Sequence, residues 1–321
     1  MAKRDVEPDE VKYSLLENGL DFIDSGLTQI AQAQNPSDLK YAVLHLGAGI
    51  ELVLKERVRR EDWKLLFRDI AKADEKLYES GNFSSINLHD CLNRLEDAGV
   101  DIAPESRRKL ESFYERRNRI QHFHFKETRE AIESSGAEVI AIVLDFIAAA
   151  FDGDTLNGQE DALLTSIRGR LSDFQRFTTE RLKAIADRVR ELKGKYGETI
   201  ECPSCLQETL NADCEVECPF CGYCDDAEDA ADLYISNVLG ETAYELEKDG
   251  GYYPHFYCPN CDNNALIEDD DGRWLCFACG YRADAGDLQI CGFCGEPKDR
   301  EGFLGSRCMD CETEYLMQDN T

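Results

Sequence analysis

Six Cys-x-x-Cys pairs lie in the last third of this 321-residue chain, and they constrain its fold more than any other feature. A two-residue spacer lets the backbone turn so that both thiolates reach one metal ion, while amides in the turn donate to the sulfurs. In a reducing compartment, cysteines clustered in this way indicate metal rather than disulfides. The predicted metal ligands are Cys202, Cys205, Cys218, Cys221, Cys258, Cys261, Cys276, Cys279, Cys291, Cys294, Cys308 and Cys311.

The spacing of the pairs predicts how they combine. Successive pairs are separated by 12, 36, 14, 11 and 13 residues, so the long gap isolates a first site from a block of four pairs. Consecutive pairing is the simplest solution and predicts three modules of four cysteines, at about residues 200–225, 256–282 and 289–313, each holding one structural zinc ion. Interleaved pairing among the last four pairs and iron in a rubredoxin-like site are the alternatives.

Local turns support small β-rich modules. Glycine follows the second cysteine of three pairs, at Gly222, Gly280 and Gly295, where a tight turn can require positive φ. Asp271-Gly272 is typical of a hairpin turn between strand-like flanks, although the acidic run there could also suggest calcium. The first two modules resemble zinc ribbons over about 25 residues each. That resemblance implies metal binding, but ribbons occur in DNA, RNA and protein binders alike.

The remaining cysteines fall outside the six pairs. Cys214 and Cys224 lie beside the first predicted site and either compete for its metal or are ordinary small residues. Cys91 is alone in a helical stretch, so we expect it to be buried and inert.

The N-terminal residues 1–152 predict an all-helical domain. Apolar residues recur at three- and four-residue steps from position 11 to 30 and again from 39 to 54, each the pattern of one buried face. Further helices are expected at 61–78, 88–98, 104–121 and 128–151. Residues 153–199 predict a long connecting amphipathic helix that could form a coiled coil, and residues 200–321 hold the cysteine modules. The fold class is therefore mainly α, with a helical bundle followed by small β-rich modules.

Charge limits the partners of this chain. It carries 65 acidic and 36 basic residues, a formal net charge of −29, which opposes general attraction to nucleic acid or anionic membranes. Residues 201–321 contain 28 acidic and six basic residues, so this tail is either a solubilising surface or a binding face for a basic partner. No signal-peptide core or membrane span is evident, and we expect a cytoplasmic protein without membrane contact.

One basic patch stands out, with eight basic and four acidic residues between positions 105 and 129. Within it, residues 116–125 read Arg-Arg-Asn-Arg-Ile-Gln-His-Phe-His-Phe. Here the chain resembles the HEPN superfamily of small helical-bundle proteins, many of which are metal-independent endoribonucleases. The family motif is an Arg, usually followed by a polar residue, and then a His, which corresponds to Arg117, Asn118 and His122. The resemblance covers about residues 10–152, including a bundle helix at 39–55.

The resemblance implies a catalytic site, and the residue types suit RNA cleavage. Histidine is the side chain best suited to proton transfer at neutral pH, so His122 can serve as acid or base, while Arg117 offers a permanent charge to the phosphate and Asn118 can orient either group. Glu51 and His124 are auxiliary candidates. The bases flanking the motif, which would contact RNA, are Arg116, Arg119 and Lys126.

The motif also predicts a homodimer. On an ideal helix Arg117 and His122 project about 140° apart, so two protomers are needed to bring both groups to one phosphate. In the HEPN family, two motifs meet in one composite cleft. The acidic tail would then recognise a partner or restrain the site, in a toxin, phage-defence or RNA-processing role. The competing interpretation is a catalytically inactive scaffold whose zinc ribbons bind protein or nucleic acid.

Overall fold

The computed structural model describes residues 12–124, 126–151, 156–213, 216–241, 246 and 252–318. The chain divides into two compact units. Unit 1 comprises residues 1–103 and 140–173, and unit 2 comprises residues 104–139 and 174–321. These boundaries differ from those predicted, because residues 104–139, which carry the basic patch, belong with the cysteine-rich segment rather than with the N-terminal helices.

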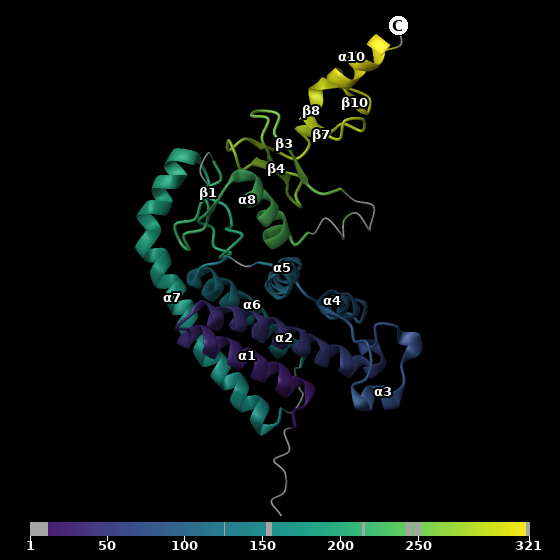
Figure 1. Cartoon of the computed structure of the whole chain (residues 1–321), viewed down its shortest axis with the longest axis vertical. Helices are drawn as coiled ribbons and strands as arrows, with labels where there is room; N and C mark the ends of the chain where they lie inside the picture. Colours follow the sequence, from purple (N-terminus) through teal and green to yellow (C-terminus); the bar gives the residue numbers. More distant parts are fainter. Residues whose placement is uncertain are drawn as a thin grey trace, which may run out of the picture. The chain divides into compact units, whose positions relative to one another are not determined.

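Unit 1 is helical and is built around an antiparallel pair, α1 (Leu15–Gln32) and α2 (Pro36–Glu61), which lie side by side (Figure 1). Both begin with a capping box. The side chain of Ser14 or Asn35 accepts a hydrogen bond from a backbone amide of the first turn, and the carboxylate of Glu17 or Asp38 accepts one from the backbone amide of the capping residue. The other helices that contribute are α3 (Glu75–Ser80), α4 (Leu88–Asp97) and parts of α6 (Arg129–Ala150) and α7 (Gly158–Tyr196). The predicted helices 88–98 and 128–151 and the long helix are thus present.

The predicted helix at 61–78 is wrong. In its place the structure has two 3-10 turns, η1 (Trp63–Leu66) and η2 (Ile70–Lys72), followed by the short helix α3. Asp62, Asp69 and Asp74 each accept a hydrogen bond from the backbone amide two residues later, at 3.0 to 3.2 Å. Such aspartates start a new turn each time, and this local bonding competes with one continuous helix.

Close packing between α1 and α2 depends on glycine. A Cβ atom on Gly49 would lie 2.6 Å from the backbone oxygen of Gly19 and 2.6 Å from Cγ1 of Ile23. A Cβ on Gly26 would lie 2.8 Å from the Leu46 side chain. These distances are shorter than any normal contact, so the two backbones can approach only where side chains are missing.

Unit 2 combines helices with small antiparallel sheets. Its helices, besides parts of α6 and α7, are α5 (Pro104–His122), α8 (Ala227–Tyr234), the π-helical turn η3 (Ile235–Leu239), the 3-10 turn η4 (Arg300–Gly302) and α10 (Met309–Gln318).

The strands of unit 2 are β1 (Val216–Glu217), β2 (Cys224–Asp225), β3 (His255–Tyr257), β4 (Asn264–Glu268), β5 (Trp274–Cys276), β6 (Arg282–Ala283), β7 (Leu288–Ile290), β8 (Pro297–Asp299), β9 (Phe303–Leu304) and β10 (Arg307–Cys308). The main sheet has the order β3-β4-β5-β6, and three two-stranded sheets pair β1 with β2, β7 with β8, and β9 with β10.

One core unites the first two cysteine modules. Phe220 and Phe277 lie inside the Cys-x-x-Cys turns of these modules, and both are fully buried in a cluster that also contains Ile235 of η3 and Leu266 of β4. The third module has a separate small cluster of three cysteines packed against Phe303. The predicted Asp271-Gly272 hairpin is present between β4 and β5, with Gly272 at φ 74°. None of the helices in the described part of the chain is both long and apolar enough to cross a membrane.

We expect Gly49→Ala to lower the free energy of unfolding of unit 1 by about 1–3 kcal/mol, since the added methyl overpacks the α1–α2 contact. Gly169→Ala is the matched control, because Gly169 also lies inside a helix but has open space around it. That substitution should raise the stability by about 0.5–1 kcal/mol. Chemical denaturation of both variants measures the difference, and equal stabilities would contradict the packing role of Gly49.

Candidate metal centres and the motif helix

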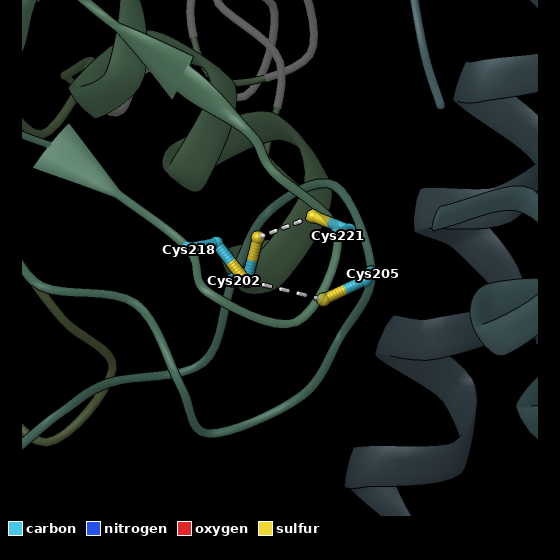
Figure 2. A group of neighbouring side chains, drawn as sticks. All are labelled: Cys202, Cys205, Cys218 and Cys221. Atoms are coloured by element: carbon cyan, nitrogen blue, oxygen red, sulfur yellow. Dashed lines mark hydrogen bonds between the residues drawn. The ribbon is translucent and has the colours of Figure 1, made fainter. Parts of the chain in front are cut away.

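Three groups of four cysteines meet in the structure, and they are the three consecutive pairings that the spacing predicts. In the first, Sγ of Cys202 lies 3.8 Å from Sγ of Cys221, and Sγ of Cys205 lies 3.7 Å from Sγ of Cys218 (Figure 2). A tetrahedral ion with metal–sulfur bonds of about 2.3 Å requires sulfur–sulfur edges of about 3.8 Å. The geometry therefore fits a four-coordinate metal ion.

The second and third groups repeat this arrangement. In the second, the Sγ atoms of Cys258 and Cys279 are 3.8 Å apart, as are those of Cys261 and Cys276. In the third, all four sulfurs lie within 4.8 Å of one another. Each group can hold one metal ion.

Most of the turns that hold the cysteines share one backbone conformation. In five of the six pairs, the residue after the second cysteine has positive φ: 60° at Leu206, 74° at Gly222, 56° at Asp262, 67° at Gly280 and 77° at Gly295. Each of these amides donates to the carbonyl of the first cysteine, at 2.8 to 3.0 Å. The sixth pair differs because its second cysteine, Cys311, lies inside α10. The glycine prediction is confirmed, and Leu206 and Asp262 adopt the same conformation without glycine.

Polar groups around the sulfurs would stabilise bound thiolates. The hydroxyl of Thr209 lies 3.1 Å from Sγ of Cys218, and the side-chain amide of Asn263 donates to Sγ of Cys261 at 3.3 Å. The backbone amide of Cys308 donates to Sγ of Cys291 at 3.4 Å. Donors of this kind orient the ligands and reduce their negative charge.

The other cysteines do not join these groups where the structure describes them. Cys224 is exposed and lies outside the first group, while Cys214 falls outside the described residues. Cys91 is fully buried, and burial raises the pKa of its thiol to about 12, so the reactive thiolate is scarce at neutral pH.

Helix α5 is bound to the first metal centre through Arg116. This guanidinium is 2% exposed and donates to the backbone carbonyls of Pro203 at 3.1 Å and Ser204 at 2.9 Å, the two residues inside the Cys202/Cys205 turn. It also hydrogen-bonds to Ser135 and forms an ion pair with Glu127 at 3.1 Å. Arg116 was predicted to contact RNA, but its burial gives it a structural position inside unit 2.

Arg119 extends the same network to η3. Its guanidinium donates to Oδ1 of Asn237 at 2.6 Å, and Nδ2 of Asn237 donates to the Pro203 carbonyl at 2.7 Å. Asn237 is 1% exposed, so these bonds are shielded from water. Burial lowers the pKa of Arg119, and the positive charge of Arg116 lowers it further. The segment 226–240 was not assigned from the sequence, although Asp226 before an apolar stretch is a helix N-cap signal.

The motif residues occupy the last two turns of α5. Nη1 of Arg117 donates to Oδ1 of Asn118 at 3.0 Å, and the Arg117 guanidinium lies over the ring of Tyr114 at 5.7 Å from its centroid. Nε of Arg117 is buried and has no hydrogen-bond partner among the described residues. His122 is exposed at the end of the helix. Arg117 and His122 lie on one continuous helix, which is the geometry from which the angle of about 140° between them was derived.

The other predicted site residues belong to both units. Glu51 lies in α2 of unit 1, where it pairs with Lys55, and Lys55 also donates to Ser85 at 3.0 Å. Arg119, His124 and Lys126 line one pocket in unit 2, whereas Arg117 and His122 are not among its lining residues. The roles assigned to these side chains in RNA binding and cleavage stay predictions.

Comparisons with protein-family models, with curated proteins and with solved structures found no match to this chain.

We expect metal analysis to show that the three centres differ in importance. Cys218→Ser and Cys308→Ser should each lower the bound metal from three ions to two per chain. Cys218→Ser should also lower the midpoint of unfolding reported by Trp274, because the first two centres share the core that contains this residue. Cys308→Ser should leave that midpoint unchanged, since the third centre has its own cluster. A large shift with Cys308→Ser would contradict this division.

An ion pair between α8 and β3 should make the stability of unit 2 depend on pH. Nδ1 of His255 lies 3.1 Å from Oδ1 of Asp232, and Nε2 lies 2.9 Å from the Asn264 carbonyl. Burial lowers the pKa of His255, but the hydrogen bond to Asp232, the bond to Asn264 and the charge of Asp232 outweigh it and raise the pKa above 6.5.

Because the folded-state pKa is raised, this stabilisation is fully present below the unfolded-state pKa and is lost as pH rises through the folded-state value. We expect the stability difference between wild type and His255→Gln to shrink from pH 6.5 to 8.5, as measured by denaturation at each pH. A difference that stays constant or grows over that range would refute the assignment.

Proposed function

We propose that this protein is a homodimeric, metal-independent endoribonuclease of the HEPN type whose three cysteine centres each hold a structural zinc ion. The supporting observation is how the side chains of α5 are bonded and exposed. Its Arg117 and Asn118 are hydrogen-bonded to each other, and its His122 is exposed, while the flanking Arg116 and Arg119 are fixed to the first cysteine centre. The helix thus combines a rigid attachment with an accessible imidazole.

The proposed chemistry uses only groups of the chain. A base removes the proton of the ribose 2′-hydroxyl, and the oxygen attacks the adjacent phosphorus. The bond to the 5′-oxygen then breaks as an acid protonates this leaving group, which leaves a 2′,3′-cyclic phosphate. His122 suits the proton transfers because imidazole titrates near neutral pH. Arg117 from the facing protomer would stabilise the charge on the phosphorane oxygens.

Asn118 fits a positioning role in this site. Its amide oxygen accepts from Nη1 of Arg117, and its amide nitrogen donates to Oε1 of Glu115 at 3.4 Å. These bonds limit the orientations that the guanidinium can adopt before the substrate binds. A preorganised cation stabilises developing charge better than a mobile one.

Zinc suits the three centres better than other metals that accept tetrahedral coordination. Four thiolates with tetrahedral spacing form a closed site with no open position, which is the arrangement of structural zinc. Each zinc tetrathiolate carries a net charge of about −2. The buried Arg116 beside the first centre would offset part of that charge. The metals would then serve folding rather than catalysis.

The acidic tail supports α5 in this account. It contacts the basic patch through the ion pair of Arg108 with Asp270, at 2.8 Å, and through the carbonyls bound by Arg116. Removing the tail would expose the buried guanidinium of Arg116 and its partner Glu127. We therefore favour support of the motif helix over autoinhibition, and partner recognition remains a further role for its exposed acidic surface.

Cleavage assays with mixed RNA and no added divalent ion test the proposal. We expect His122→Ala and Arg117→Ala each to lower the rate by about 100-fold or more, since general acid–base catalysis and charge stabilisation each contribute factors of this size. Arg190→Ala is the control, because Arg190 is an exposed arginine on α7. If wild type and all three variants are equally inactive, the scaffold interpretation holds. If all cut equally, the activity lies elsewhere.

A further inference from the structure

A pocket of about 620 Å³ in unit 2 is not used by the proposed catalytic motif. Helix α5 contributes Arg119 to its lining, and the α5–α6 connection contributes His124 and Lys126. Asp225 of β2 and Asp229 of α8 also line it. Its volume lies within the range of about 300–1,000 Å³ that holds small organic ligands. The pocket therefore combines basic and acidic groups in a space of ligand size.

The charges that remain available in this pocket are balanced. Glu127 pairs with Arg116, and Asp232 pairs with His255 and accepts from the Tyr253 hydroxyl at 2.9 Å. Among the described residues, neither Lys126 nor Asp229 forms an ion pair. The pocket is thus dipolar, and it favours a ligand with an anionic group and separate hydrogen-bond donors.

Two buried polar atoms among the lining residues lack partners. The hydroxyl of Tyr223 and Oε2 of Glu127 are buried, and neither has a hydrogen-bond partner in the described structure. The Glu127 side chain is 10% exposed. Buried polar atoms are normally satisfied by protein, water or ligand. Both residues line the pocket, where water or a ligand is the partner expected for such atoms.

Crowding among the carboxylates supports the same conclusion. Repulsion from Asp226, followed by burial and the charge of Asp225, raises the pKa of Asp229. Neutral hydrogen-bond donors from a ligand would relieve this repulsion between the carboxylates.

We propose that this pocket binds one nucleotide of an RNA strand, with its phosphate at Lys126 and His124 and the donors of its base at Asp225 and Asp229. Lysine and histidine bind phosphate oxygens, and aspartate accepts from exocyclic amino groups such as N4 of cytosine. Tyr223 and Tyr253 supply aromatic surface for the base. A polyamine would leave Lys126 without an anion, and a free amino acid would leave the aromatic surface unused.

The pocket deepens the proposed function and rests on it for the class of ligand. His124 follows the proposed catalytic His122 by two residues, so a strand held in the pocket passes close to the end of α5. The nucleotide bound there would flank the cleaved bond. The pocket would then select the sequence that is cut.

Binding to the full-length, zinc-loaded chain carrying His122→Ala, in which cleavage is blocked, tests this inference. The probes are the four ribonucleoside monophosphates and fluorescein-labelled tetranucleotides of cytidine, guanosine, adenosine or uridine. Adding Lys126→Gln should weaken binding of all probes about tenfold and reduce its salt dependence. Adding Asp229→Asn should weaken binding of cytidine, guanosine and adenosine probes, whose bases each carry an exocyclic amino donor, more than binding of uridine probes.

Matched controls are Lys183→Gln and Asp187→Asn, which alter exposed charges on α7 outside the pocket. Binding of monophosphates indicates that a free nucleotide suffices, and binding of tetranucleotides alone indicates that the site needs RNA. Either result supports the site if the pocket variants lose affinity and the controls do not. Equal affinity of pocket variants and controls, or binding of spermidine in place of nucleotides, overturns it. A wild type that binds but never cleaves RNA would reject the ribonuclease while the pocket stands.

Discussion

The contact between Arg116 and the first cysteine turn is the interaction on which the candidate site depends. One guanidinium satisfies the carbonyls of Pro203 and Ser204 and neutralises Glu127 in the interior of unit 2. Removing one partner of a buried ion pair costs about 3–5 kcal/mol, and each buried carbonyl left unpaired costs about 1–3 kcal/mol. These terms are large compared with a total stability of about 5–15 kcal/mol. The conformation of the first cysteine turn and the position of α5 are therefore coupled.

This contact places part of the basic patch in the interior of unit 2, since Arg116 is buried there. Arg116 and Arg119 face carbonyl and amide oxygens of the chain, while Arg117 and His122 project from other faces of the same helix. The 3.6-residue repeat places these two pairs of side chains on different faces of α5. Adjacent arginines of α5 therefore lie in different environments.

The sequence predicted the features that depend on local spacing. The cysteine pairing followed from the loop lengths, and α1, α2, α5 and α7 followed from apolar periodicity and caps. The helix at 61–78 failed because three aspartate caps compete with the apolar pattern. The partners of Arg116 lie 87 and 88 residues away, and no local pattern encodes such a contact. Many acidic residues of the tail also act locally, as when Asp269 accepts bonds from Arg273 in the β4–β5 hairpin.

Hydrogen–deuterium exchange of α5 with the first centre occupied and vacant tests the central claim most directly. The vacant state is obtained with Cys205→Ser, which removes one ligand of that centre without changing α5 itself. We expect backbone amides of residues 110–122 to lose protection when the first centre is vacant, while α1 in unit 1 keeps its protection. Unchanged protection of α5 in the vacant state would contradict the claim that the metal centre holds the motif helix.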